Sequence, residues 1–242
     1  MSSSQRPLIH FDEVSSTMDV IRECVQAGHS PWVIVTASTQ LCGRGRRGAE
    51  WSNAGVSLLM SWLIPASDHF MDAQKVSLAV GLGVADVCDS LFDVPSIGLK
   101  FPNDVLLRGG KVGGVLVENW VLADAPYWVI GVGVNMAGAP DVDGSLLPVT
   151  ALDIPVRPSV AEMASQIALG VDTLLDDAVT PGADLVTAWN KRFIRPQSRL
   201  HNTLGMVTIL CLLDCENVVI TQEGGQLAVV RGASLLPETQ SV

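Results

Sequence analysis

The segment Thr39–Trp51 places three arginines among three glycines, directly after an apolar run at 32–35 that is typical of a strand. Glycines allow a chain to turn tightly and to approach a ligand closely. Arginines on such a turn offer paired donors to a carboxylate or a phosphate. A second apolar run at 56–64 suits another strand. The sequence therefore predicts a strand–loop–strand unit whose loop closes over an anion.

The same loop admits other interpretations. Gly43, Gly45 and Gly48 match the spacing of a dinucleotide-binding fingerprint, but that fingerprint requires a helix to follow at once. Here residues 50–55 are rich in helix breakers, so the match is weak. The loop is not a Walker loop, because no Gly-Lys-Ser/Thr ends it. A solvated basic turn without a ligand is the remaining alternative.

Charge is sparse and unevenly placed in this chain. Its 242 residues suffice for one larger domain and a small one, and 48% of them are apolar. A net charge of −10 argues against a nucleic-acid binder, whose affinity rests on cationic contacts to phosphate. Six of the fifteen Lys and Arg nevertheless lie in or beside turns between positions 44 and 111: Arg44, Arg46, Arg47, Lys100, Arg108 and Lys111. This clustering favours a local anion pocket.

Cysteine usage and the termini bear on the compartment. Five cysteines without a CxxC pair predict reduced thiols, and core packing is favoured over metal binding at Cys211 and Cys215. The first residues form no apolar signal segment, and no apolar run approaches the ~18 residues that span a bilayer. We therefore expect a soluble, cytoplasmic protein without membrane contact.

Hydrophobic periodicity predicts the other elements of the first 195 residues. Ser16 with Asp19, and Ser159 with Glu162, are candidate capping boxes at helix starts. The expected helices run from Ser16, from 67 or 68 to about 92, from 159 to about 179 and from 180 to about 193, and the other expected strands are at 8–11, 97–99, 105–107, 111–118 and 127–135. Gly81 and Gly83 inside the second helix indicate close packing on a sheet.

The C-terminal part changes to a period of two. Val207, Ile209, Cys211 and Leu213 alternate along one predicted strand, and further short strands follow at 218–220 and 227–230. A turn is expected at Gly224-Gly225. Short strands joined by tight turns predict a small β-barrel. The Gly-, Pro- and Asp-rich residues 136–157 predict a long loop, which is uncommon without a function.

Two further segments carry glycines or polar residues at strand ends. In 100–104, Pro102 restricts Phe101 to extended geometry, and Asn-Asp after it favours a turn. Lys111 begins a strand that continues with Gly113 and Gly114, and 131–135 repeats this theme. Glycine weakens a strand unless something must approach the backbone.

Five segments in this order resemble the biotin protein ligase family, whose members attach biotin to biotin-dependent carboxylases: Ser16-Thr17, 40–48, 100–104, 111–118 and 131–136. The resemblance covers residues 8–195. It implies an α+β fold, a mixed sheet with helices packed on it as in biotin/lipoate ligases and class II synthetases, plus a small C-terminal SH3-like barrel. The implied domains are 1–195, catalytic, and 196–242, the barrel. Regulatory members begin with a helix-turn-helix domain, whereas only about seven residues precede the first expected strand here. We therefore expect the non-repressor subclass.

The resemblance also implies roles for single residues. Lys111 and Arg46 are implied as catalytic, and Trp51, Asn103, Asp104 and Asn135 as nucleotide-binding. The implied biotin-binding residues are Ser16, Thr17, Gln40, Gly43, Arg44, Gly45, Arg46, Lys111 and Gly114. Asp104 is a candidate either for a site near Mg²⁺ or for receiving the proton of an acceptor lysine. Met18 and Phe101 depart from the family's usual asparagine and tryptophan.

The expected activity uses ATP with Mg²⁺ to form biotinyl-5′-AMP, then transfers biotin to a lysine of a carrier partner. That partner is the biotin carboxyl carrier domain of acetyl-CoA carboxylase or a related carboxylase; no nucleic acid is expected, and the protein is a monomer or homodimer. Three alternatives stay open: a lipoate or octanoate transfer enzyme of the same fold, a DNA-binding biotin sensor, and an inactive biotin binder. The acidic balance opposes the sensor, and Arg44, Arg46 and Lys111 oppose a pure binder.

Overall fold

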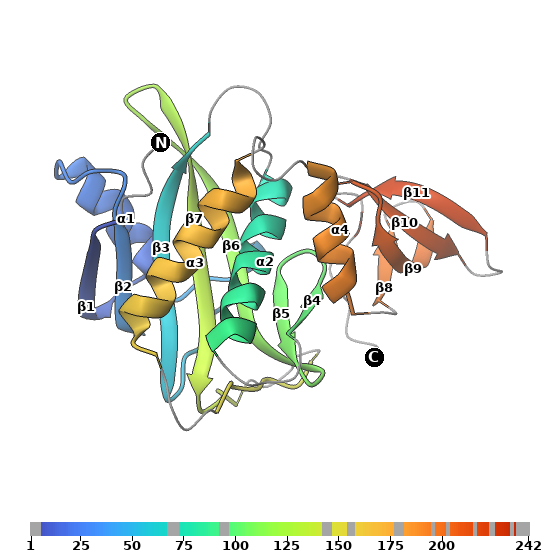
Figure 1. Cartoon of the computed structure of the whole chain (residues 1–242), viewed down its shortest axis with the longest axis horizontal. Helices are drawn as coiled ribbons and strands as arrows, with labels where there is room; N and C mark the ends of the chain where they lie inside the picture. The colour runs from blue at the N-terminus through green and yellow to red at the C-terminus, as the bar shows by residue number, and fades with distance from the viewer. Residues whose placement is uncertain are drawn as a thin grey trace.

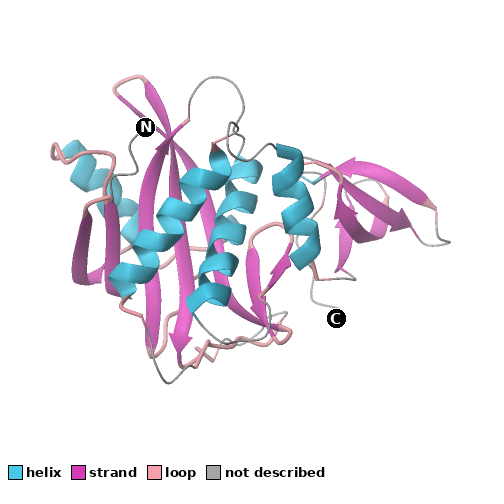
Figure 2. Ribbon diagram, viewed as in Figure 1, coloured by secondary structure: helices cyan, strands magenta, loops and turns pink. Residues whose placement is uncertain are grey.

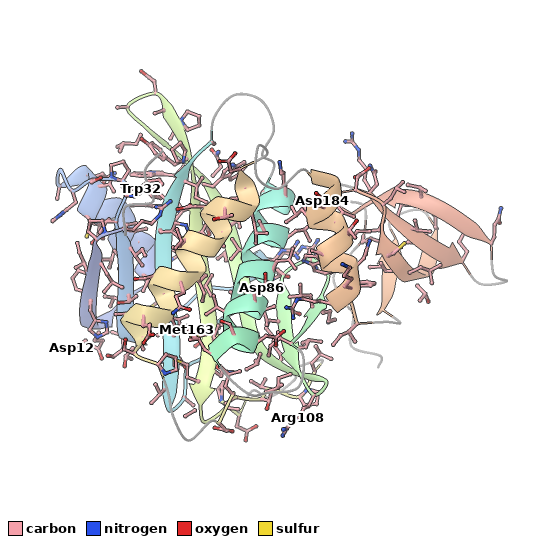
Figure 3. All side chains as sticks on the ribbon, viewed as in Figure 1. Asp12, Trp32, Asp86, Arg108, Met163 and Asp184 are labelled. Atoms are coloured by element: carbon pink, nitrogen blue, oxygen red, sulfur yellow. The ribbon has the colours of Figure 1, made fainter. Side chains whose placement is uncertain are left out.

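Two β-sheets organise the protein. The computed structural model describes residues 6–66, 73–91, 97–141, 147–153, 158–176, 182–194, 197–201, 204–214, 217–222, 226–232 and 235. A seven-stranded main sheet occupies most of the molecule, and a four-stranded sheet lies at the end opposite β1 (Figure 1). The labelled side chains of Asp12, on β1, and Asp184, on α4, lie toward these opposite ends (Figure 3).

The main sheet is mixed, with the strand order β1-β2-β3-β7-β6-β5-β4. Its strands are β1 (Leu8–Val14), β2 (Ile34–Gln40), β3 (Val56–Pro65), β4 (Gly98–Lys100), β5 (Asp104–Leu107), β6 (Gly110–Leu122) and β7 (Ala125–Ala137). Strands β1 and β2 pair in parallel, whereas β2 and β3 pair antiparallel. The predicted strand–loop–strand unit is therefore confirmed. Strand β2 runs on to Gln40 instead of ending at Val35, because its second half pairs with β1.

Helices cover both faces of the main sheet (Figure 2). Helices α2 (Ala73–Leu91) and α3 (Val160–Leu175) lie on one face, α1 (Thr17–Gln26) on the other, and α4 (Gly182–Arg192) beside the small sheet (Figure 1). Ser159 caps α3 as predicted, since its Oγ accepts from Glu162 N at 3.1 Å. Ser16 caps α1, but its Oγ accepts from Met18 N, so the predicted box with Asp19 does not form. Among the described helices, none is both long and apolar enough to cross a membrane.

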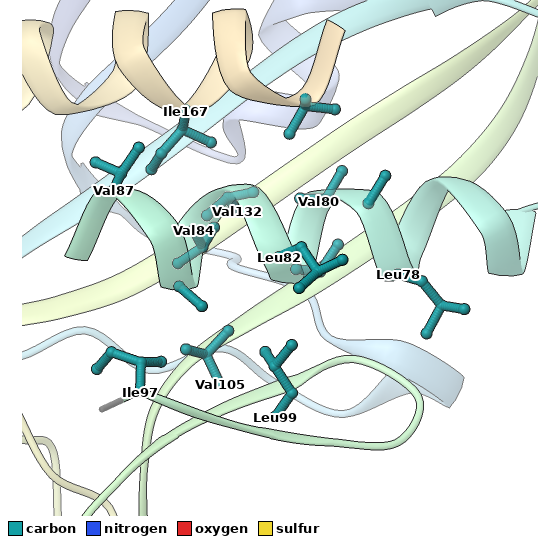
Figure 4. Packing of buried hydrophobic residues seen from close by; sticks show 14 of the residues in the cluster. Leu78, Val80, Leu82, Val84, Val87, Ile97, Leu99, Val105, Val132 and Ile167 are labelled. Atoms are coloured by element: carbon teal, nitrogen blue, oxygen red, sulfur yellow. The ribbon is translucent and has the colours of Figure 1, made fainter. Parts of the chain in front are cut away.

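The main core lies between the sheet and helices α2 and α3. In Figure 4, Val87 of α2 lies beside Ile167 of α3, while Leu99 and Val105 of the strands lie on the other side of α2. The two helix glycines permit these approaches. A Cβ on Gly83 would lie 2.7 Å from Val171 Cγ2, and one on Gly81 would lie 3.6 Å from Leu99 Cδ2. Close packing at these glycines is confirmed, although Gly83 packs on helix α3 and not on the sheet.

The C-terminal sheet has the strand order β11-β10-β9-β8, with antiparallel neighbours. Its strands are β8 (Gln197–His201), β9 (Gly205–Leu212), β10 (Asn217–Gln222) and β11 (Leu227–Arg231). Strand β8 was not predicted. Within the described residues β8 and β11 are edges, so a four-stranded sheet stands where a barrel was expected.

A bulge changes which residues of β9 are buried. The register with β10 shifts between Val219 and Ile220, so Ile209 and Leu212 are buried while Leu213 is exposed. The predicted strict alternation over Val207, Ile209, Cys211 and Leu213 is therefore wrong. The predicted turn at 224–225, the helix segments at 67–72 and 177–181, Cys215 and the domain boundary at 195/196 lie outside the described residues.

Candidate functional site

A row of cross-strand partners forms the floor of a cavity. Lys100 on β4 pairs with Asp104 on β5, Asp104 with Gly114 on β6, and Gly114 with Gly133 on β7. Residues paired across strands point to the same face, so two charged side chains and two glycines lie side by side. Their neighbours Val115 and Val132 belong to the core under α2 and α3, which places the row on the opposite face. The cavity above it has a volume of about 650 Å³.

The predicted turn is present at residues 101–103, but Asp104 already stands at the start of β5. The strand begins one residue after Asn103 because Asp104 pairs with both Lys100 and Gly114. Two hydrogen bonds join Asn103 to Val115 of β6. Asn103 Nδ2 donates to Val115 O, and the backbone carbonyl of Asn103 accepts from Val115 N, each at 3.0 Å. The Phe101–Pro102 peptide bond before them is cis.

The glycine–arginine loop covers one side of the cavity. Trp51 N donates to Gly43 O at 2.9 Å and closes the loop at its base. Arg46–Gly48 form a short 3₁₀ turn at its tip, where Gly48 has a φ of 79° that favours glycine. Arg46 Nη1 donates to Asn103 Oδ1 at 3.2 Å, so the loop tip contacts the opposite wall.

The indole of Trp51 explains the glycines of the floor. A Cβ on Gly133 would lie 2.4 Å from Trp51 Cε2, and one on Gly114 would lie 3.3 Å from Trp51 Cζ3. Any side chain at Gly133 would therefore displace the ring. Trp51 Nε1 is buried and has no hydrogen-bond partner among the described residues. The ring supplies an aromatic wall with one unused donor.

Asp104 lies between two lysines. Its Oδ1 is 2.7 Å from Lys111 Nζ, and its Oδ2 is 3.8 Å from Lys100 Nζ. The Lys111 ammonium also lies 5.8 Å from the centre of the Trp51 ring. The Lys111 backbone is fixed by the segment after β7, because its N–H donates to Pro148 O at 2.7 Å and its carbonyl accepts from Thr150 N at 2.9 Å.

Arg44 is engaged by a carboxylate of helix α1. Its Nη1 and Nη2 donate to Asp19 Oδ2 and Oδ1 at 2.6 and 2.8 Å. This bidentate hydrogen bond holds the pKa of Asp19 below its usual value and raises the pKa of Arg44. Arg44 lines the cavity, but its guanidinium is held at α1.

The part of the cavity lined by α1 and β2 is polar and internally hydrogen-bonded. Gln40 Oε1 accepts from Thr17 N at 2.8 Å and from Thr17 Oγ1 at 3.0 Å. Because Thr17 Oγ1 donates its only proton there, Ser61 Oγ donates to it at 2.8 Å. These bonds fix the Gln40 amide, and its Nε2 has no partner within the described part of the chain. Ser16 also lines this part, with its Oγ used in capping α1.

Two predicted site residues do not line the cavity, Gly43 and Asn135. Asn135 is buried, and its Nδ2 donates to Thr150 O at 3.0 Å. Its Oδ1 has no partner among the described residues, and the same holds for Asn53 Oδ1. Residues two apart on a strand point to one face, so the Asn135 side chain stands on the Trp51 side of β7, like Gly133.

The other predicted site residues all line this one cavity: Ser16, Thr17, Gln40, Arg44, Gly45, Arg46, Trp51, Asn103, Asp104, Lys111 and Gly114. Arg108, counted among the clustered cations, is exposed at the β5–β6 turn and does not line it (Figure 3).

Sequence reasoning missed several lining residues. Lys100 was counted among the clustered cations but was given no role of its own, whereas Gly232 and Leu235, which follow β11, carried no signal. Met18 fills the space beside Gly131, since a Cβ added to Gly131 would lie 2.7 Å from the Sδ of Met18.

The described part of the wall carries few side chains that could bind a metal. No group of three or more His, Cys, Asp or Glu able to hold a metal occurs among the described residues. The lining carboxylates are Glu50 and Asp104, and Asp104 already faces two ammonium groups. A position of Mg²⁺ near Asp104 therefore stays a prediction, since Mg²⁺ bound with ATP needs only one or two protein carboxylates.

The fold and this site define a class of protein. Residues 11–135, slightly over half of the chain, match the model of the Biotin/lipoate A/B protein ligase family, and the chain belongs to this family. The biotin–[acetyl-CoA-carboxylase] ligase of Mycobacterium tuberculosis is 37% identical over 131 residues, 52% of this chain and 48% of that protein. The enzyme of the same name from Paracoccus denitrificans is 36% identical over 114 residues, 46% of this chain and 47% of that protein. The chain matches about half the length of both relatives.

Solved structures agree on the fold. The biotin protein ligase from Aquifex aeolicus in complex with biotin and ATP superposes with a TM-score of 0.77 at 21% identity, covering 96% of this chain and 98% of that one. The biotin acetyl coenzyme A carboxylase synthetase from Helicobacter pylori with bound biotinylated ATP gives 0.64 at 23% identity, over 93% of this chain and all of that one. The predicted mixed sheet with packed helices is confirmed.

Proposed function

We propose that this protein activates biotin with ATP as biotinyl-5′-AMP and transfers the biotin to a lysine of a biotin carboxyl carrier domain. The carrier belongs to acetyl-CoA carboxylase or a related carboxylase. One observation carries the proposal: a single cavity is lined both by an oriented amide, that of Gln40, and by the cations Lys111 and Arg46. The relatives named biotin–[acetyl-CoA-carboxylase] ligase support biotin over lipoate or octanoate as the substrate.

The polar part of the cavity suits the ureido ring of biotin. Thr17 holds Gln40 Oε1, which leaves the Nε2 protons as donors for a carbonyl oxygen. A site with an oriented donor discriminates against a ligand that lacks the matching acceptor, because the donor would stay unpaired. Lipoate and octanoate have no polar group for that part, so they would leave this amide unpaired.

Adenylation joins two anions, and the cations of the cavity reduce their repulsion. A carboxylate oxygen of biotin attacks the α-phosphorus of ATP, the new P–O bond forms, and the bond to pyrophosphate breaks with pyrophosphate as the leaving group. Lys111 and Arg46 would stabilise the charge on the phosphoryl oxygens. One hydrogen bond to a charged group contributes about 1.5–3 kcal/mol, so two account for a rate factor of about 10²–10⁴. Mg²⁺ enters with ATP, and no step is assigned to a protein-held ion.

The nucleotide base would lie toward Trp51 and Asn135. Trp51 Nε1, Asn53 Oδ1 and Asn135 Oδ1 are buried polar atoms without partners among the described residues. Buried polar groups are nearly always paired in proteins, so these atoms suit a ligand edge that offers both donors and acceptors. A purine offers both. Asn103, held to Val115 and in contact with Arg46, would border the same end.

Transfer to the carrier is an acyl substitution. The amine of the acceptor lysine attacks the acyl carbon, a C–N bond forms, the C–O bond to phosphate breaks, and AMP leaves. The amine must lose a proton, and Asp104, the lining carboxylate beside Lys111, is our candidate for orienting it. Contact between Arg46 and Asn103 would keep water from the mixed anhydride until the carrier arrives.

The test is a labelling assay with the purified chain, biotin, ATP and a carrier domain, run beside Lys111→Ala. The matched control is Lys191→Met, since Lys191 is an exposed lysine on α4. Biotinyl-AMP and labelled carrier are expected with the wild type and Lys191→Met, with Lys111→Ala slower by about 10²–10³. Transfer of octanoate or lipoate in place of biotin would overturn the proposal. Biotin binding without transfer would favour a sensor or an inactive binder.

A further inference from the structure

We propose that Lys100 is a positioning residue for adenylation, holding Asp104 so that Lys111 can move to the substrate anion. The proposal rests on the function proposed above and extends it to a residue to which the sequence assigned no role. Lys111 and Lys100 face different oxygens of one carboxylate, at 2.7 Å from Oδ1 and 3.8 Å from Oδ2. Asp104 thus has a second ammonium beside it, on the oxygen that Lys111 does not contact.

The two lysines differ in freedom. The side chain of Lys111 is 30% exposed and faces the Trp51 ring, whereas that of Lys100 is 8% exposed. Strand β4, which carries Lys100, is fixed by its neighbour Leu99. The Leu99 side chain is buried, and its carbonyl accepts a hydrogen bond from Ile194 N at 2.9 Å. Lys111 is therefore the ammonium that can leave Asp104, and Lys100 is the one that stays.

The departure of Lys111 has an electrostatic cost that Lys100 reduces. Without a second cation, the Asp104 carboxylate, 17% exposed, would stand uncompensated beside an anionic phosphate. A partly buried charge without a partner is strongly destabilising, and the nearby like charge adds repulsion. With Lys100 in place, Asp104 keeps a counter-charge while Lys111 binds the anion. Lys100 thus acts on the reaction through Asp104.

A double-mutant cycle between Lys100 and Asp104 tests this dependence. Single-turnover release of pyrophosphate is measured with biotin and ATP for the wild type, Lys100→Met, Asp104→Asn and the double variant. Lys100→Met is expected to slow release about tenfold in the wild-type background and less than about twofold in the Asp104→Asn background, because the neutral amide needs no counter-charge. Lys100→Arg should retain most of the rate, and Lys191→Met all of it.

Several outcomes would overturn the inference. An unchanged rate in Lys100→Met would do so, and so would an equal fold-loss in both Asp104 backgrounds, since Lys100 would then act independently of that carboxylate. Rates are normalised to the fraction of molecules that bind biotin, which removes loss of folding from the comparison. If Lys100→Met does not fold, Lys100→Gln replaces it in the same cycle. Failure of the proposed function is distinct, because the wild type itself would then release no pyrophosphate.

Discussion

The guanidinium of Arg44 lies 2.6 and 2.8 Å from the two carboxylate oxygens of Asp19, and this pair joins the glycine–arginine loop to helix α1. Arg22 extends the connection, because it donates both to Asp19 and to Glu118 on β6. The sequence marked Arg44 as an anion ligand, whereas in the structure its side chain anchors the loop. Arg46 and Lys111 are the lining cations that the proposed function assigns to the phosphate.

Removing the charge of Asp19 should loosen the loop without unfolding the protein. In Asp19→Asn we expect faster tryptic cleavage after the arginines of the loop, with a loss of stability of about 0.2–1 kcal/mol, since both partners are about one-third exposed. Asp19→Glu, which keeps the charge, is the control. Equal cleavage rates in Asp19→Asn and the wild type would contradict the anchoring role.

The pair should also show a defined pH dependence. The pKa of Asp19 is lowered from 3.8, so its contribution to stability is complete above 3.8 and is lost as the pH falls through the lower folded-state pKa. The pKa of Arg44 is raised by its hydrogen bond to Asp19, so Arg44 stays charged throughout. The difference in unfolding free energy between the wild type and Asp19→Asn, measured in urea, should shrink toward zero in this acidic range. A constant difference from pH 7 downward would argue against the pair.

Arg46 should retain the activated intermediate. Its contact with Asn103 closes the loop over the cavity, so Arg46→Gly is expected to release biotinyl-adenylate and to label lysines of a bystander protein. The measurement is biotin incorporation into serum albumin in the presence of ATP, with Arg46→Lys as the charge-preserving control. Labelling that stays confined to the carrier domain would show that the prediction is wrong.

Gly133 should be required for the site and dispensable for the core. A Cβ there would lie 2.4 Å from Trp51 Cε2, so Gly133→Ala is expected to displace the indole and weaken ATP binding at least about tenfold. Gly170 on α3 is a matched control, since a Cβ there meets nothing within 4 Å. Gly170→Ala should raise stability by about 0.5–1 kcal/mol and leave binding unchanged. Calorimetric titration and thermal unfolding separate the two effects.

The described thiols should differ sharply in reactivity. Burial raises the pKa of Cys88 to about 12, so almost no thiolate is present at neutral pH and the group is inaccessible. Cys42 is exposed beside the loop. Maleimide at pH 7 is expected to label Cys42 quickly and Cys88 only after unfolding, as mass spectrometry of peptides would report. Rapid native labelling of Cys88 would contradict its burial.

Local sequence signals predicted much of the fold and the residue types of the site. The strand–loop–strand unit, the caps of α1 and α3 and the 105–107/111–118 hairpin follow from periodicity and capping, which depend on neighbours in the chain. The start of β5 at Asp104 and the bulge between β9 and β10 were not predictable, because each depends on a partner strand. Strand β8 was not predicted for the same reason, since its pairing with β9 defines it.

By itself, the sequence determined which side chains are available to the site, because the glycines, arginines and lysines and the spacing between them can be read directly along the chain. Only the tertiary structure decided how they are used. Strand register placed Lys100 beside Asp104 and put glycines under Trp51, and the docking of α1 turned Arg44 toward Asp19. The physical reason is that contacts between residues distant in sequence depend on pairing and packing, which no local pattern encodes.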